Sequence, residues 1–148
     1  MRILRPTAPL SLLAVLASAA PAPAAQELTG KTSQQRKIVV RLADDGRVTF
    51  ARFDWVAKCR GGNFRLFDGR TNLGEPMQVS TPTEFSDTGT YSERFKGGIR
   101  ARISVTGGGT RQADGSWAGT FQITKLVARR RGKRVGTCRS SVIRWTVR

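Results

Sequence analysis

Apolar and polar residues alternate in short runs along most of the chain. The clearest run is residues 99–106, where an apolar residue at every odd position alternates with arginine, serine or threonine. Residues 48–59 and 143–147 show the same period of two. That period is typical of a β-strand with one buried face. Because no stretch shows helical periodicity, the pattern predicts an all-β domain.

Turn-forming residues separate these runs. Three hairpin turns are expected, at Asp44–Arg47, at Gly97–Gly98 and around Gly132 within Arg129–Arg134. Two other segments are interpreted as loops. One is Arg70–Asp87, with two prolines, after a short strand over Phe64–Phe67 that turns at Asp68 and Gly69; the other is Thr106–Gly115, with three consecutive glycines.

About eight short strands at hairpin spacing predict a small antiparallel barrel or sandwich. The one-sided alternation favours a closed or nearly closed barrel, with the sandwich as the alternative. The polar phase places Arg100, Arg102 and Arg144 at the surface. The apolar phase of the strands should form the core, with Phe53, Trp55, Ile99, Ile103, Val105, Phe121, Ile123, Ile143 and Trp145.

The three tryptophans, Trp55, Trp117 and Trp145, all fall in the apolar phase of their strands. Core packing is therefore their expected role. An aromatic platform for stacking sugars or bases is the alternative, and it requires at least one indole to point outward.

The amino terminus has the organisation of a secretory signal peptide. Arg2 and Arg5 precede an apolar run over residues 10–20, and small residues and prolines follow. We expect residues 1–24 to be removed, with cleavage after Ala24 preferred to cleavage after Ala25. A buried amino-terminal helix is the alternative. The predicted organisation continues with an extended lead-in over residues 25–36 and a single β domain over residues 37–148. The later sequence predicts no membrane span.

Two cysteines, Cys59 and Cys138, lie in the part expected to be exported. An even number of cysteines in an oxidising compartment indicates a disulfide. A zinc site is disfavoured because the chain has no histidine, and a redox pair is usually a close C-x-x-C. The sequence therefore predicts a disulfide-bonded protein that is secreted or held in the cell envelope.

Several short motifs occur in a recognisable order: Gly30–Gln34, Asp45-Gly46, Cys59, Ser116–Phe121, Gly136–Cys138 and Trp145. This order resembles a group of small exported bacterial proteins, common in high-GC organisms, whose function is unassigned. The resemblance covers most of the chain after the leader. It implies secretion, a β-rich fold and paired cysteines, and it supplies no catalytic or binding residues.

Candidate catalytic groups are sparse. Without histidine, a serine or cysteine nucleophile lacks its usual base. Paired carboxylates could hydrolyse a glycoside, and Asp54 and Glu93 are the acids within predicted strands. Their simpler expected role is to pair with cross-strand arginines on the solvated face. We therefore predict a protein that is not an enzyme, with no catalytic residue, no metal site and no cofactor.

Charge is the strongest functional signal. The formal charge is +16, and removing the two arginines of residues 1–24 leaves +14, with 18 arginines, 6 lysines and 10 acidic residues. No acidic residue follows Asp114. Arginine suits bidentate contacts with phosphate or carboxylate. A predicted hairpin tip concentrates Arg129, Arg130, Arg131, Lys133 and Arg134, which we assign as the candidate polyanion-binding residues.

The sequence thus predicts a secreted, non-catalytic β domain that binds anionic polymers of the envelope or exterior. Wall or lipid phosphates, acidic polysaccharide and extracellular nucleic acid are the partners considered, without sequence-specific nucleic-acid recognition. General surface charge without a partner is one alternative. A secreted enzyme or enzyme inhibitor with a site built from loops is another, and a barrel enclosing a small apolar ligand is a third.

Overall fold

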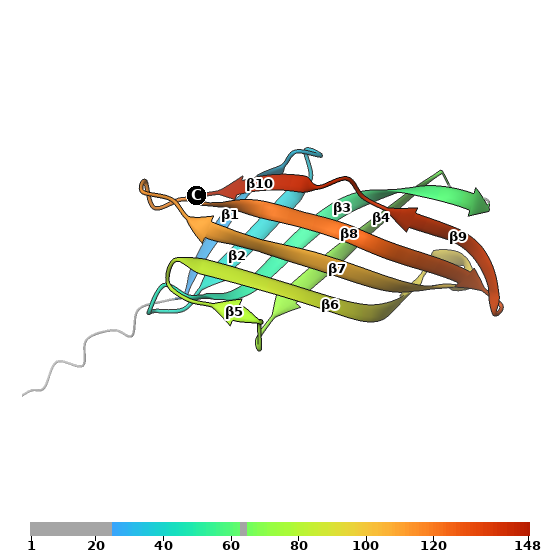
Figure 1. Cartoon of the computed structure of the whole chain (residues 1–148), viewed down its shortest axis with the longest axis horizontal. Helices are drawn as coiled ribbons and strands as arrows, with labels where there is room; N and C mark the ends of the chain where they lie inside the picture. The colour runs from blue at the N-terminus through green and yellow to red at the C-terminus, as the bar shows by residue number, and fades with distance from the viewer. Residues whose placement is uncertain (1–24, 63–64) are drawn as a thin grey trace, which may run out of the picture.

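The computed structural model describes residues 25–62 and 65–148 (Figure 1). This part of the chain is all β, with ten strands, one 3₁₀ turn η1 (Lys96–Gly98) and only antiparallel pairings. The predicted fold class is therefore confirmed, with ten strands in place of about eight. The strands are β1 (Gln26–Thr32), β2 (Lys37–Leu42), β3 (Val48–Gly62), β4 (Leu66–Gly74), β5 (Val79–Ser80), β6 (Glu84–Phe95), β7 (Ile99–Arg111), β8 (Trp117–Arg130), β9 (Lys133–Arg139) and β10 (Ile143–Val147).

The strands form one sheet that partly closes into a ring. Two long strands, β3 and β8, each change partner along one edge. β3 pairs first with β2 and then with β9, while β8 pairs first with β10 and then with β9. Since β10 also pairs with β1, the path β1-β2-β3-β9-β8-β10 returns to its start. In Figure 1, β6, β7 and β8 form the near layer, and β2, β3 and β4 cross behind it.

Outside this ring, β4 pairs with β3, and β6 pairs with β5 and β7. No backbone pairing joins β4 to β6 in the described structure, and side chains bridge this opening. Trp55 Nε1 donates a hydrogen bond of 2.8 Å to Thr71 Oγ1, which lies 2.6 Å from the Tyr91 hydroxyl. The rings of Phe67 and Phe95 meet edge to face beside them, with centroids 4.6 Å apart. The molecule therefore combines a closed side, as in a barrel, with an open side, as in a sandwich.

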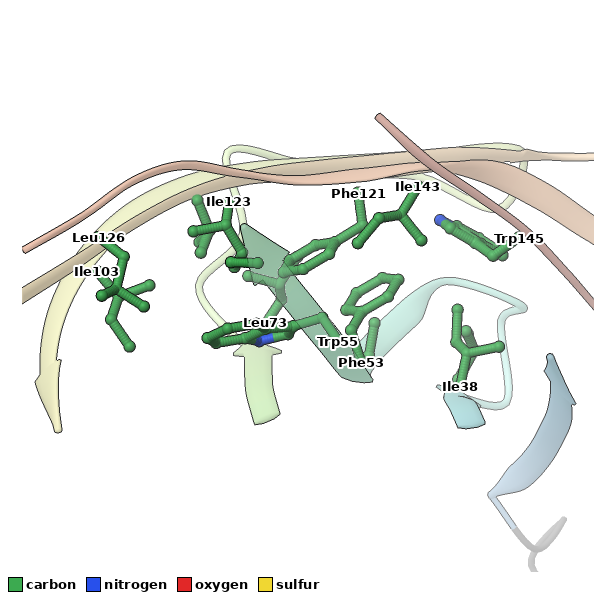
Figure 2. Packing of buried hydrophobic residues seen from close by; sticks show 14 of the residues in the cluster. Ile38, Phe53, Trp55, Leu73, Ile103, Phe121, Ile123, Leu126, Ile143 and Trp145 are labelled. Carbon is green, nitrogen blue, oxygen red and sulfur yellow. The ribbon is translucent and has the colours of Figure 1, made fainter. Parts of the chain in front are cut away.

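The core occupies the space between the two layers (Figure 2). The rings of Phe53 and Phe121 stack with centroids 4.3 Å apart, and Trp145 meets Phe53 edge to face. Trp55 and Trp117 are also fully buried, so the core role of the tryptophans is confirmed and the aromatic-platform alternative is wrong. Arg100, Arg102 and Arg144 are exposed, and all nine residues expected in the core are buried, which confirms the strand registers.

The predicted loop over Arg70–Asp87 is wrong, since the second half of β4, all of β5 and the start of β6 lie within it. β4 does not turn at Asp68 and Gly69 but pairs with β3 from Leu66 to Gly74. A Cβ atom on Gly69 would lie 2.3 Å from the Trp55 indole ring. The large ring fills the space of a side chain on β4, so this strand carries glycine where a strand pattern expects an apolar residue.

The predicted loop over Thr106–Gly115 is also wrong for its first half. β7 continues through the three glycines to Arg111, and the turn covers only residues 112–116. A Cβ atom on Gly109 would lie 2.5 Å from the Trp145 ring. Close packing of an indole against the β7 backbone therefore explains the glycine at this position, where the sequence suggested flexibility.

The segment expected as an extended lead-in forms β1, which pairs with both β2 and β10. Residues 26–32 are thus part of the sheet and help to close the ring. The predicted signal peptide, residues 1–24, lies outside the described residues. In the described part of the chain, we find no helix of the length and hydropathy needed to cross a membrane.

The predicted disulfide between Cys59 and Cys138 is confirmed. The two residues face each other directly on β3 and β9, with an S–S distance of 2.01 Å. The bond joins positions 79 residues apart in the sequence. It therefore fastens the pairing through which β9 links β3 to β8.

Candidate anion-binding face

The hairpin between β8 and β9 presents the predicted basic cluster to solvent. Arg130 pairs with Lys133, and the two residues between them turn the chain with positive φ angles, 48° at Arg131 and 79° at Gly132. Positive φ at both positions is the requirement of a type I′ hairpin turn. The hairpin lies at the opposite end of the molecule from the carboxyl terminus (Figure 1). The structure brings together all five predicted residues, each exposed: Arg129, Arg130, Arg131, Lys133 and Arg134.

The sheet register extends this cluster into a row of four arginines across four strands. Arg94 of β6 lies directly opposite Arg100 of β7, and Arg100 lies opposite Arg129 of β8. Arg129 in turn lies opposite Arg134 of β9. Side chains of directly paired residues point to the same face, with Cβ atoms about 5 Å apart. We call Arg94, Arg100, Arg129 and Arg134 the arginine row.

The arginine row has no acidic partner in the described structure. The ion pairs among the described residues involve Arg36, Arg41, Arg47, Arg70 and Arg148, none of which belongs to the row. Like charges placed directly opposite each other destabilise a sheet. An anion bound along the row would remove this repulsion.

Beside the row, the outer surface is hollowed where β9 leaves β8. Ser140 binds back to β8, because its backbone N–H donates to the Ile123 carbonyl at 3.0 Å and its Oγ accepts from Ile123 N–H at 2.9 Å. This contact keeps the chain close to β8 as it passes from β9 to β10. The resulting β8–β9 hollow has a volume of about 700 Å³ and contains four cationic side chains, Lys58, Arg60, Lys125 and Arg139.

A bulge in β8 directs one of these cations outward. The pairing of β7 with β8 skips Thr124, since Ser104 lies opposite Lys125 and Val105 lies opposite Ile123. A bulge of this kind re-aims side chains and increases local twist. As a result, consecutive residues Thr124 and Lys125 are both exposed and both line the β8–β9 hollow.

A second hollow lies over β6, β7 and β8, with a volume of about 600 Å³. We call it the β7–β8 hollow. Its cations are Arg100, Arg102, Lys125 and Arg129, and its remaining lining is uncharged. Lys125 borders both hollows. We call the arginine row and the two hollows together the basic face.

Asp54 and Glu93, the two acids that the sequence placed within predicted strands, occupy different environments. Asp54 lies opposite Arg70 on the next strand and receives hydrogen bonds of 2.6 and 3.3 Å from its guanidinium, which is the simpler role expected for it. Glu93 does not lie on the solvated face as expected. It pairs with buried Ala101, and its Oε2 atom is buried without a hydrogen-bond partner in the described structure. Both residues border a shallow hollow of about 310 Å³.

Burial raises the pKa of the Glu93 carboxyl above its ordinary value of 4.5. The folded protein therefore holds this proton more tightly than the unfolded chain, so the cost of the charge appears as pH rises above 4.5. We expect Glu93→Gln to unfold at a higher temperature than the parent at pH 7. The difference should disappear in acid, where Glu93 is protonated in both states. Thermal melts from pH 3 to 7 test this, and a difference that grows on acidification would contradict it.

Sequence reasoning found the hairpin tip but not the rest of the face. Arg100 and Arg102 were expected at the surface without a functional role, and Arg94 was not singled out. The sequence does indicate that these three arginines are exposed, because each occupies the polar phase of its strand. Only the pairings of β6 and β7 with β8 and β9 show that their side chains lie on the same surface as Arg129 and Arg134.

Comparisons with known proteins returned no match among protein-family models, curated proteins or solved structures. Within residues 25–62 and 65–148, no group of three or more histidine, cysteine, aspartate or glutamate side chains is placed to hold a metal ion.

Proposed function

We propose that this chain is an exported, non-catalytic domain that binds anionic polymers through the basic face. The observation that carries the proposal is the arginine row, in which four arginines occupy directly paired positions across β6, β7, β8 and β9. The like-charge contacts of the row destabilise the folded protein when no ligand is bound. A bound polyanion would neutralise these charges, so the same arginines would form an attractive binding surface. The disulfide supports the export part of the proposal, because such bonds persist in oxidising compartments.

The side chains of the face suit non-selective binding. Arginine donates paired hydrogen bonds to phosphate or carboxylate oxygens and keeps its charge at all ordinary pH values. Proteins that bind single-stranded nucleic acid usually present exposed aromatic side chains on which the bases stack. Neither hollow is lined by an aromatic residue. The affinity should therefore come from charge and counterion release, with little dependence on the identity of the polymer's repeating unit.

The hairpin tip provides a direct test. We expect the triple variant Arg129→Ser/Arg130→Ser/Arg131→Ser to elute from a phosphate resin at a clearly lower salt concentration than the parent. Its melting temperature should not fall, because all three side chains are exposed and the loss of Arg129 removes two like-charge contacts of the arginine row. Salt-gradient elution measures the first quantity and thermal unfolding the second.

A matched control keeps net charge from explaining the result. The triple variant Arg36→Ser/Arg41→Ser/Arg47→Ser removes the same charge from arginines that already have carboxylate partners away from the basic face. We expect it to elute close to the parent. If the tip variant and the control elute together, overall charge governs retention and the tip is not a site.

A further inference from the structure

We propose that the basic face is a two-subsite site for a linear, flexible phosphate polymer that occupies the β8–β9 hollow and the β7–β8 hollow at once. This inference rests on the proposed function and specifies its ligand. Lys125 lies where the hollows meet, so one chain can pass from the first hollow to the second over a cation.

The strand order sets the direction of the bound chain. The β8–β9 hollow takes its cations from β3, β8 and β9, and the β7–β8 hollow takes its cations from β7 and β8. Strands in a sheet lie about 4.8 Å apart, so the path from β3 to β7 over β9 and β8 covers roughly 14 Å. A polymer that fills both hollows therefore runs across the strands, whereas a single phosphate fits in one hollow.

The lining of the hollows favours phosphate groups. Uncharged hydroxyl and amide side chains accompany the cations, including Gln122, Thr137 and Ser141 in the first hollow and Thr90 and Ser92 in the second. Neither hollow contains a carboxylate. A phosphate offers several acceptor oxygens for such mixed donors, and arginine binds it through two parallel hydrogen bonds. Because no aromatic side chain lines either hollow, nucleic-acid bases would lack the aromatic platforms on which single-stranded nucleic acid usually stacks.

Two linked subsites predict an affinity that depends on chain length. Once one part of a polymer occupies a hollow, the second contact is intramolecular, and linkage of this kind raises affinity by about 10²–10⁴ without any new type of contact. A ligand confined to one hollow gains nothing from the other. The ratio of long-chain to short-chain affinity is therefore the quantity that reports on the second subsite.

The test compares tripolyphosphate with long-chain inorganic polyphosphate by isothermal titration calorimetry of the full exported protein, at equal phosphate concentration. One variant, Lys58→Ser/Arg139→Ser, alters the β8–β9 hollow, and Arg100→Ser/Arg102→Ser alters the β7–β8 hollow. The control, Arg111→Ser/Arg144→Ser, removes two exposed arginines far along the sheet from the row. Arg111 of β7 pairs with Trp117, and Arg144 of β10 pairs with Thr120, both near the start of β8. Thermal unfolding verifies that each variant is folded.

We expect the parent to bind the long chain at least tenfold more tightly than tripolyphosphate, and either hollow variant to lose most of this ratio while the control keeps it. Equal ratios in all variants, or an equal loss in the control, would overturn the two-subsite site and leave the proposed function standing. Tighter binding of a mixed-sequence single-stranded oligonucleotide with the same number of phosphates would overturn the choice of ligand. Failure of the parent to bind the long chain at low salt would refute the proposed function itself.

Discussion

Loss of the Cys59–Cys138 bond is expected to cause a large fall in stability. The bond closes a loop between positions 79 residues apart, and chain-entropy arguments give a contribution of up to about 4.5 kcal/mol for a loop of this length. It also fastens β9 against β3, the pairing through which the ring passes on to β8. We expect the double variant Cys59→Ala/Cys138→Ala to unfold at a much lower denaturant concentration than the oxidised parent.

The same experiment contains its own control. A reducing agent should destabilise the parent to the level of the double variant and leave the double variant unchanged. Mass spectrometry under non-reducing conditions should give a parent mass two hydrogens below that of the reduced form. Equal unfolding midpoints for parent and double variant would show that the bond contributes nothing to the fold.

Substitution within the arginine row is expected to change stability and binding in opposite directions. Arg100→Thr/Arg129→Thr removes all three like-charge contacts of the row. Relief of these contacts, and the good strand propensity of threonine, should raise the free energy of unfolding by about 1–2 kcal/mol, or the melting temperature by roughly 4–8 °C. Loss of two phosphate contacts should lower the affinity for long-chain polyphosphate roughly tenfold or more at moderate salt.

The control here is Arg111→Thr/Arg144→Thr, which makes the same charge change away from the row. We expect neither the gain in stability nor the loss of affinity in this variant. If the row variant is less stable than the parent, the arginines stabilise the sheet, and repulsion no longer argues for a ligand.

Strand positions with a local signal could be predicted from the sequence. In residues 99–106 every apolar residue of the alternating pattern is buried. Gly132 lies in the hairpin turn that the sequence predicts there. The pattern failed where a distant residue decides which side chain fits. Trp55 lies against Gly69 and Trp145 against Gly109, so both glycines belong to strands although the sequence suggested turns or loops.

The candidate site likewise has one part that the sequence predicts and two parts that it does not. The hairpin tip is contiguous in the sequence, so its charge is visible without a structure. The arginine row depends on pairings between β6, β7, β8 and β9, and a shift of one residue in any of them would move an arginine to the other face. The β8–β9 hollow depends further on the bulge at Thr124 and on the contact of Ser140 with Ile123. Neither feature has a clear signal in a single sequence.

The salt dependence of polyphosphate binding tests the role of the basic face most directly. For a single-stranded phosphate polymer, the logarithm of the affinity falls with the logarithm of salt concentration by about 0.7 for each phosphate neutralised. We expect a steep slope for the parent and a slope shallower by about 1.4 for Arg100→Thr/Arg129→Thr, because two contacts are lost. The Arg111→Thr/Arg144→Thr control should keep the slope of the parent. Identical slopes for the parent and the row variant would show that the arginine row does not contact the polymer.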